Sequence, residues 1–268
     1  MRFELGCVPY VNARPLVEAF ETGPLAERAH VTYKLPSSLP AAIDSGEVHA
    51  ALTSSFDALR TPGRCIAGGA CIGTRGAAES VRLFSKKPIA EIRSLALDAS
   101  SLTSNHLAQI ILAERYGAKP QVLHAPPVQE EMLAKADACV LIGDIGMIAP
   151  GEGLHVLDLG AEWLALTGLP FVWAAWTGDE GLSPDLAALL LEAREWGEAN
   201  LETVIDKSEE RVSWPEGAVR SYLSSTMSYE LSPEHLEGMR LFQRKLSAHG
   251  FIPDQPFPRM QAPPTYAR

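Results

Sequence analysis

The sequence predicts an α/β protein of two lobes, with mainly parallel sheets and a ligand cleft between the lobes. Two observations lead to this expectation: strand-like and helix-like segments alternate along most of the chain, and they fall into two successive units. Two such lobes joined by two crossings place strand ends and helix N-termini around one cleft. A hydrophobic fraction of 46% indicates that the chain of 268 residues buries a substantial core.

The first unit opens with an apolar strand that runs directly into a helix. This helix begins near Pro15, and proline suits a first helical turn because its missing N–H would have no partner there. A second short helix is expected to start at Ser37 or Ser38 and to end at Gly46. Strands of this unit are expected at residues 5–8, 31–35, 48–52 and 80–84.

The second unit repeats the alternation from about residue 94 onward. Its segment SSLTSNHLAQIILAERYGA predicts a well-capped helix that closes at Gly117. From Pro184 the pattern becomes helical, so these late helices must cover one of the lobes. Strands of the second unit are expected at residues 94–97, 121–124, 138–143 and 155–159, and a further helix at 128–135.

This alternation sets the expected lobe boundaries. One lobe is expected to comprise residues 1–86 plus 173–268, and the other residues 87–172, with the strands SVRLFSK and PFVWAAW as the two crossings. Residues 253–268 are rich in proline and show no periodicity. They are expected to form a mobile tail or one that lies on the surface.

Charge and composition narrow the class of partner. The net charge of −10 argues against nucleic acid or an anionic membrane as the main partner, but helix N-termini still allow a small anion to bind. No apolar run has the length of a membrane span, and the N-terminus does not resemble a secretory signal. The four cysteines form no CxxC pair. We expect a cytoplasmic protein, monomeric or homodimeric, whose partner is a small molecule.

A set of short motifs points to a known family. The segments VPYVNARPL, PSSL, AALTSS, SVRLFSK, SSLTS, VLIGD and DLGAEWLALTGLPFVWAAW follow one another along about the whole chain. In their order and spacing they resemble the MqnA family, the chorismate dehydratases of the futalosine menaquinone pathway. The resemblance implies a fold like that of type 2 periplasmic binding proteins, with the ligand held between two lobes.

The resemblance also implies an activity. Chorismate is a dicarboxylate with a ring hydroxyl and an enolpyruvyl ether, and loss of water from it gives the aromatic 3-[(1-carboxyvinyl)oxy]benzoate. Because aromatisation makes this reaction strongly downhill, positioning of the substrate can supply much of the catalysis. No zinc motif, glycine-rich phosphate loop or nucleophile elbow is present, so neither a metal nor an organic cofactor is expected.

Asn12 and Ser80 are the two catalytic candidates. Asn12 lies in the turn between the first strand and helix, where its amide is placed to hold a substrate carboxylate or only to cap the helix. The residues alone slightly favour the local turn, and the resemblance reverses that order. Ser80 precedes a strand expected to cross between the lobes, so its hydroxyl is expected to face the cleft. Tyr10, in the same motif as Asn12, is expected to contact the substrate.

Hydroxyl groups at two other junctions are expected to bind carboxylates through hydrogen bonds without formal charge. Thr103 and Ser104 open the helix that closes at Gly117, where they either hold the second carboxylate or cap the helix themselves. Ser54 and Ser55 end the strand VHAAL, and substrate binding and a plain turn explain them equally well.

Three further side chains are candidates for substrate contact. Arg82 lies on the strand beside the proposed site, although its alternation with Val81 and Leu83 also suits a solvated arginine. Asp144 follows an apolar strand and is expected to orient the substrate or to have a structural role. Phe171 follows a glycine and a proline at a lobe crossing and is expected to contact the ring, within an aromatic cluster that is mostly core.

The catalytic base is not evident among the side chains. His106 is the best candidate because it lies in the first turn of the helix opened by Thr103, but a histidine exposed on a helix face is the simpler interpretation. If no side chain serves, the enolpyruvyl carboxylate of the substrate, held by Asn12, is the base. Two alternatives remain open: 1,4-dihydroxy-6-naphthoate synthase of the same pathway, and a non-catalytic binding protein for small anions.

Overall fold

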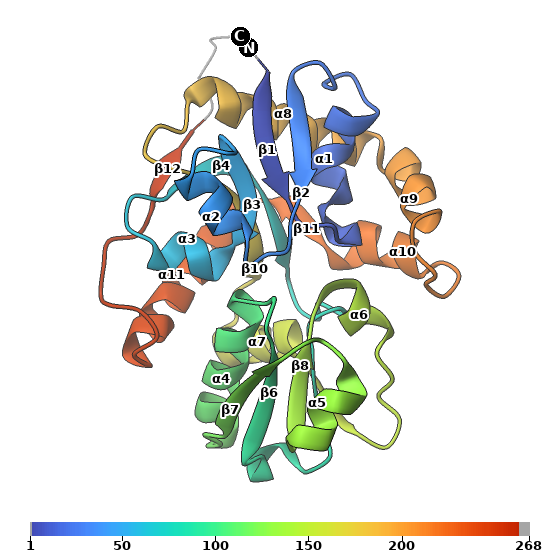
Figure 1. Cartoon of the computed structure of the whole chain (residues 1–268), viewed down its shortest axis with the longest axis vertical. Coiled ribbons are helices and arrows are strands. Elements are labelled where there is room, and N and C mark those ends of the chain that lie inside the picture. The colour runs from blue at the N-terminus through green and yellow to red at the C-terminus, as the bar shows by residue number, and fades with distance from the viewer. Residues whose placement is uncertain (1, 263–268) are drawn as a thin grey trace.

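The computed structural model describes residues 2–262, which form two lobes that lie one above the other in Figure 1. The strands of the first lobe are β1 (Phe3–Cys7), β2 (Ala29–Tyr33), β3 (Ala50–Ser54), β4 (Cys65–Thr74), β10 (Phe171–Gly178), β11 (Ser228–Glu230) and β12 (Arg259–Gln261). They form one sheet in the order β11-β4-β10-β3-β1-β2, with β12 paired to β4. This sheet therefore combines strands from both ends of the chain.

The second lobe is built entirely from the middle of the chain. Its strands are β5 (Arg82–Ser85), β6 (Ser94–Asp98), β7 (Gln121–Ala125), β8 (Ala138–Leu141) and β9 (His155–Asp158). They form a five-stranded sheet in the order β7-β6-β8-β5-β9. Its helices are η2 (Ile89–Glu91), α4 (Thr103–Tyr116), α5 (Gln129–Lys135), α6 (Gly143–Ile148) and α7 (Leu159–Thr167).

The helices of the first lobe come from both ends of the chain. They are η1 (Val11–Ala13), α1 (Arg14–Glu21), α2 (Leu39–Asp44), α3 (Ser55–Arg60), α8 (Pro184–Ala199), α9 (Leu201–Glu209), α10 (Ala218–Ser221), the π-helical turn η3 (Tyr222–Thr226) and α11 (Pro233–Ala248). Helix α8 packs on α1 and β4, and α11 packs on β10. The late helices therefore cover the first lobe (Figure 1).

The chain passes between the lobes at residues 75–81 and again at residues 168–170. The expected lobes of residues 1–86 plus 173–268 and residues 87–172 are therefore wrong at both boundaries. Strand β5 pairs with β8 and β9 in the second sheet, and Phe171 already pairs with Thr74 in the first. Because both lobes are α/β, an apolar strand has the same pattern in either sheet, and only tertiary pairing decides between them.

In both sheets, antiparallel strand pairs occur where a strand adjoins a crossing between the lobes. The pairs β1–β2, β1–β3, β6–β7, β6–β8 and β4–β12 are parallel. Every antiparallel pair involves β4, β5 or β10, the strands that adjoin a crossing. The chain returns from one lobe to the other in these strands, so they enter each sheet against the direction set by the βαβ units.

Several local predictions are confirmed. Pro15 lies in the first turn of α1, and Gly117 ends α4 with a φ of 66°. Ser38 is the N-cap residue of α2, although its side chain accepts no capping hydrogen bond. The expected helical run after Pro184 is divided at Asn200 into α8 and α9.

One strand differs from expectation. Strand β4 is absent from the predicted elements because its sequence, CIAGGACIGT, contains three glycines, which weaken the strand pattern. The tail from residue 253 follows the second of its two expected forms, since β12 lies on the surface at the edge of the first sheet, beside β4. Residues 263–268 of that tail lie outside the described residues.

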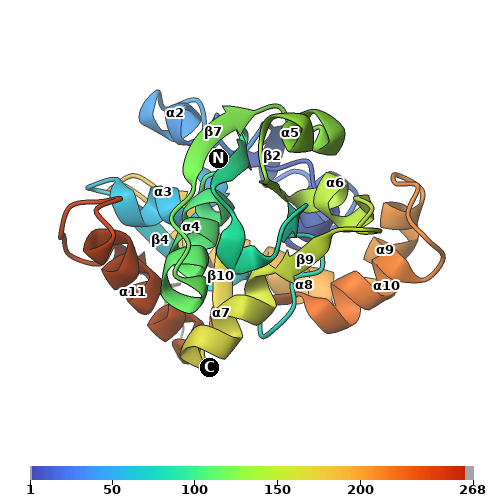
Figure 2. The same ribbon diagram turned by 90° about the horizontal axis from the view of Figure 1, so that it is seen from below.

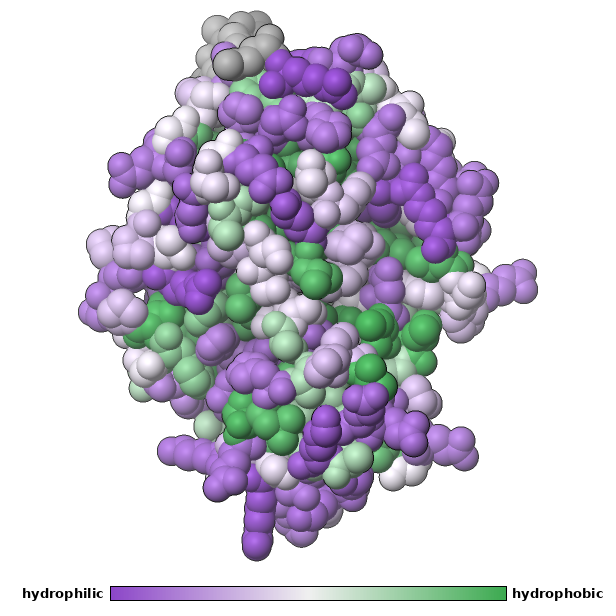
Figure 3. Space-filling model, in the orientation of Figure 1, coloured by the Kyte–Doolittle hydropathy of each residue, from purple (hydrophilic) through white to green (hydrophobic). Residues whose placement is uncertain are grey.

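The surface is mixed in polarity (Figure 3). Apolar side chains gather around the middle of this face, and hydrophilic ones dominate its upper edge. Among residues 2–262, the most exposed large apolar side chains are Ile148 and Leu35, at 56% and 53%. No helix in this part of the chain combines the length and the apolar character that a membrane span requires.

Candidate active site

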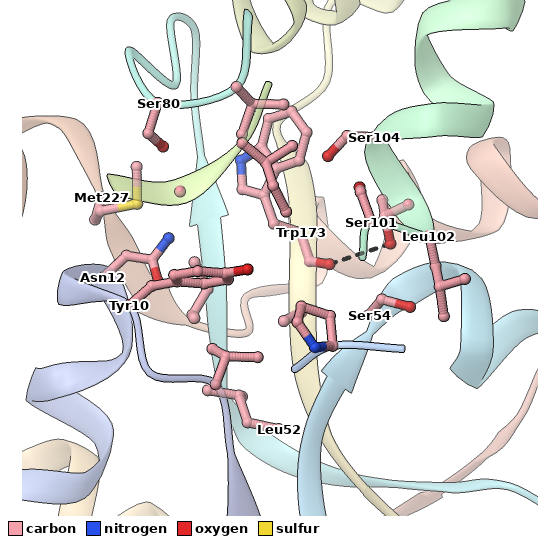
Figure 4. Close-up of a pocket in the computed structure, with 18 of the residues that line it drawn as sticks. Tyr10, Asn12, Leu52, Ser54, Ser80, Ser101, Leu102, Ser104, Trp173 and Met227 are labelled. Carbon is pink, nitrogen blue, oxygen red and sulfur yellow. Dashed lines mark hydrogen bonds between the residues drawn. The ribbon is translucent and has the colours of Figure 1, made fainter. Parts of the chain in front are cut away.

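A cavity of about 590 Å³, open to solvent, lies where the two lobes meet (Figure 4). The first lobe contributes residues after β1, the end of β3 and the middle of β10, and the second contributes the start of α4 and the loop after β8. In Figure 4, Asn12, Ser80 and Met227 lie on one side of the cavity and Ser101 and Ser104 on the other. The cavity thus has polar groups at two separate positions.

The first polar position is a hydrogen-bonded chain of three side chains. Asn12 Nδ2 donates to Tyr222 Oη at 3.2 Å, and Tyr222 Oη lies 2.6 Å from Ser80 Oγ. Asn12 comes from η1, Ser80 from the first crossing and Tyr222 from η3, so tertiary folding brings them together. Asn12 Oδ1 is buried and has no hydrogen-bond partner among residues 2–262. An unpaired buried carbonyl is costly and therefore typical of a functional site.

The second polar position is the N-terminus of α4. Its N-cap residue is Leu102, whose side chain cannot cap, so the N–H groups of the first turn receive no side-chain cap. The hydroxyls of Ser101 and Ser104 line the cavity and make no hydrogen bond to any side chain or backbone atom among residues 2–262. Uncapped N–H groups beside free hydroxyls form a site that suits an anion.

Two of the other predicted hydroxyl groups border the cavity, but they already make hydrogen bonds within the protein. Ser54 accepts a hydrogen bond from Asp57 N at 3.2 Å as the N-cap of α3, which leaves its hydrogen free to donate. Thr103 donates to Trp173 O at 3.3 Å and accepts from Phe56 N at 3.1 Å. Since its hydrogen is already donated, Thr103 ties α4 to the first lobe.

The space between the two polar positions is apolar. Trp173 stands in the middle of Figure 4, and its Nε1 donates to Thr74 Oγ1 at 3.1 Å, which fixes the indole. The remaining apolar lining includes Val8, Leu52, Ile72, Val81 and Met227. A planar indole and aliphatic walls suit a flat, mostly hydrocarbon ring.

Tyr10 closes the cavity on the side of α6. Its ring lies against Gly143, where an added Cβ would stand 2.9 Å from Tyr10 Cδ1. Beside it, Val11 N donates to Asp144 Oδ1 at 3.2 Å, a hydrogen bond between the lobes. Burial raises the pKa of Asp144, and the Val11 hydrogen bond offsets this only in part. Asp144 is absent from the lining of the cavity, so it joins the lobes rather than facing the space inside.

Three other candidates are placed away from the cavity. Ser55 donates to Val172 O at 2.6 Å inside the core. Arg82 donates from Nε to Gly146 O and from Nη2 to Met147 O, both at 2.8 Å, so it binds the carbonyl end of α6 rather than the substrate or solvent. Phe171 packs edge-on against Trp173 and Phe242 in the core. The prediction that these side chains line the cleft is wrong.

His106 is also turned away from the cavity. Its ring stacks on Phe56 at 3.7 Å between centroids, and its Nδ1 bonds to Leu102 O at 2.8 Å. Burial lowers the pKa of His106. It is therefore neither the exposed histidine of the simpler interpretation nor within reach as a base; it is part of the packing between the lobes.

The cavity is uncharged. Its lining among residues 2–262 contains no aspartate, glutamate, histidine, lysine or arginine. Burial raises the pKa of Tyr10 to about 12 and raises that of Tyr222 further, so both phenols are protonated at neutral pH. Within the same residues, no group of three or more histidine, cysteine, aspartate or glutamate side chains is placed to hold a metal ion.

The sequence interpretation missed Tyr222 and Trp173 as lining residues. The pattern of its strand, which is apolar throughout, places Trp173 in the core, and one end of the indole does lie there. Tyr222 lies in the segment GAVRSYLSS, which reads as an ordinary amphipathic helix. The π-helical turn that begins at Tyr222 leaves no clear mark in the local pattern.

Comparison with known proteins identifies the family. A family model described as menaquinone biosynthesis matches residues 3–248. The chain belongs to this family. This confirms the family to which the sequence motifs pointed. A chorismate dehydratase from Thermus thermophilus is 27% identical over 264 residues, covering 91% of this chain and 95% of the relative.

Solved structures of other proteins share the fold of this chain. Protein AF1704 from Archaeoglobus fulgidus has a TM-score of 0.75 at 16% identity and covers 94% of this chain and 98% of its own. The alkanesulfonate-binding protein SsuA from Xanthomonas axonopodis pv. citri has a TM-score of 0.66 at 14% identity, covering 97% and 98%. Likeness to such binding proteins confirms the predicted two-lobed fold class.

Proposed function

We propose that this member of the menaquinone biosynthesis family is a chorismate dehydratase, a hydro-lyase that converts chorismate to 3-[(1-carboxyvinyl)oxy]benzoate and water. Two findings support an enzyme of this kind: the family match over residues 3–248 and the Thermus relative of that name. The sequence identity of 27% to this relative supports the family, and the geometry of the cavity must support the reaction itself.

The observation that carries the proposal is the arrangement of the two polar positions. Asn12 and Ser80 lie on one side of an apolar cavity, and the uncapped start of α4 with Ser101 and Ser104 lies on the other (Figure 4). Chorismate has a six-membered cyclohexadiene ring with one carboxylate on the ring and a second on its enolpyruvyl ether, and the ring becomes flat only in the aromatic product. The ring carboxylate would bind at α4, and the enolpyruvyl carboxylate would bind beside Asn12.

The uncharged lining bears on the identity of the base. With no carboxylate or imidazole among the described lining residues, the bases in the filled cavity would be the substrate's own carboxylates. The enolpyruvyl carboxylate is attached, through the ether oxygen, to the ring carbon that loses its hydrogen. Held by the Asn12 amide, this carboxylate would take the hydrogen from the ring carbon that bears the ether. The C–H electrons then form the aromatic ring, and the neighbouring ring hydroxyl leaves as water after it receives the proton that the carboxylate has accepted. The enzyme's contribution in this scheme is the orientation of the substrate.

The proposal is tested by mixing purified protein with chorismate, without added cofactor, and following the ultraviolet spectrum and the product mass. We expect the spectrum of a substituted benzoate and a mass reduced by one water. Chorismate bound but unchanged would support a binding protein instead. Absence of both binding and turnover would direct the search to the naphthoate synthase step.

A pair of variants tests the assignment of the base. Asn12→Ala removes the amide that holds the carboxylate, and we expect turnover to fall about 100- to 1,000-fold, as when one preorganised donor is lost. His106→Ala is the matched control, because His106 packs outside the cavity, and we expect turnover within about fivefold of the wild type. A larger loss for His106→Ala than for Asn12→Ala would contradict the scheme.

A further inference from the structure

Tyr222 belongs to the late helices that cover the first lobe, yet it lines the cavity between the lobes. It is 0% exposed, and its ring packs edge-on against Trp214 at 5.4 Å between centroids. It begins the π-helical turn η3, which Met227 N closes by donating to Tyr222 O at 3.0 Å. Single π-helical turns are frequent at functional sites. Here the turn places the phenol at the cavity, next to Met227.

The hydroxyl of Tyr222 connects groups from different parts of the chain. It lies 3.2 Å from Asn12 Nδ2 and 2.6 Å from Ser80 Oγ. An amide nitrogen can only donate, so Tyr222 Oη accepts from Asn12. Among residues 2–262, Ser80 Oγ is then the acceptor within reach for the phenol hydrogen, and a buried hydroxyl without an acceptor is costly.

The hydrogen bond from Tyr222 determines where the hydrogen of the Ser80 hydroxyl points. When Tyr222 donates to Ser80 Oγ, the hydrogen of Ser80 is released to point into the cavity. The same phenol accepts from Nδ2 of the Asn12 carboxamide, whose Oδ1 has no partner among the described residues. Because burial raises the pKa of Tyr222, the phenol stays protonated and the chain keeps this direction at neutral pH.

We propose that Tyr222 is a positioning residue, whose hydroxyl orients the Asn12 amide and the Ser80 hydroxyl toward the substrate. The proposal rests on the dehydratase function given above. Tyr222 acts through Asn12 and Ser80, and its ring also forms part of the cavity wall.

The test is the variant Tyr222→Phe, which keeps the ring and its packing on Trp214 and removes one oxygen. We expect kcat for chorismate dehydration to fall about 10- to 100-fold, because a small misplacement of orienting groups costs this much, while KM changes less than about threefold. Tyr229→Phe is the matched control. Tyr229 is also buried, but its hydroxyl has no partner among residues 2–262 and it does not line the cavity. This control should retain wild-type kcat.

Non-additivity separates positioning from a general loosening of the fold. If Tyr222 acts partly through Ser80, the loss caused by Tyr222→Phe should shrink at least about threefold in a Ser80→Ala background. A loss of the same size in both backgrounds would overturn the proposal, as would a Tyr222→Phe enzyme within about threefold of wild-type kcat. Wild-type protein that does not dehydrate chorismate would instead overturn the proposed function, and this role with it.

Discussion

Replacement of Gly143 by alanine tests whether the contact between Tyr10 and α6 shapes the cavity. Gly143 has a φ of 60°, a left-handed conformation that costs a residue with a side chain about 1–2 kcal/mol. The added Cβ would lie 2.9 Å from Tyr10 Cδ1 and 3.0 Å from Cε1, closer than carbon atoms pack. Overpacking of this kind costs a further ~1–3 kcal/mol. The free energy of unfolding should therefore fall by about 2–5 kcal/mol in total.

Gly117 provides a control that isolates the Tyr10 contact. Its φ is 66°, close to that of Gly143, but an added Cβ meets nothing within 4 Å. Gly117→Ala should therefore show the conformational cost of about 1–2 kcal/mol without the overpacking. Urea unfolding followed by circular dichroism measures both variants under the same conditions. The difference between them is the cost of the clash with Tyr10.

The activity of the two glycine variants should differ as well. Because Tyr10 lines the cavity, its displacement in Gly143→Ala should lower kcat/KM for chorismate about tenfold, whereas Gly117→Ala should retain wild-type activity. In a Tyr10→Val background, the extra destabilisation of Gly143→Ala should disappear. Equal destabilisation of the two glycine variants, with equal activity, would refute the argument that Gly143 is a glycine because of Tyr10.

Two further predictions concern buried charges. Glu18 is 0% exposed and pairs with Arg14, and although burial raises its pKa, hydrogen bonds from Thr22 and Arg14 lower it overall. Glu18→Gln should cost about 3–5 kcal/mol in urea unfolding at pH 7, and the difference should shrink below pH ~4.5, where the wild type also loses this stabilisation. Burial raises the pKa of Asp144, so its charge lowers the free energy of unfolding as pH rises from ~3.9. Asp144→Asn keeps an acceptor for Val11 and should raise the thermal midpoint at pH 7 but not at pH ~3, whereas a lower midpoint at pH 7 would contradict this reasoning.

The sequence predicts the elements of this fold better than their partners. The periodicity and the turn residues place α1, α2 and α4 within a few residues, because glycine, proline and capping groups act locally. The lobe boundary at β5 is wrong because its apolar pattern suits either sheet, and the pairing with β8 depends on residues more than fifty positions away. Local chemistry therefore identifies elements, and long-range pairing assigns them to a lobe.

The difference between local chemistry and long-range pairing also explains which residues of the site could be predicted. Asn12, Ser54, Ser80 and Ser104 were found because strand ends and helix starts in this fold face the cleft, and all four line the cavity. The prediction for Ser55 is wrong because neighbouring side chains point in different directions. Ser54 borders the cavity, and Ser55, the next residue, donates into the core. No local pattern shows that Arg82 binds the end of α6, because that contact forms only when the chain folds back.

Helix α4 shows how the two lobes share one functional element. By sequence it belongs to the second lobe, yet Phe56 of the first lobe stacks on His106, and Lys245 and His249 of the first lobe pair with Glu114. On the other side of the cavity, at α6, the lobes meet through the contact of Tyr10 with Gly143 and the hydrogen bond from Val11 N to Asp144 Oδ1.

Separation of the lobes on the α4 side would break ion pairs, an aromatic stack and the hydrogen bonds of Thr103. Separation on the α6 side would break a hydrogen bond of 3.2 Å and the packing of one ring on a glycine. The cost of opening is therefore lower at α6, and the start of α4 stays fixed relative to Trp173. The contact of Tyr10 with Gly143 is therefore a weaker connection between the lobes than the contacts made by α4.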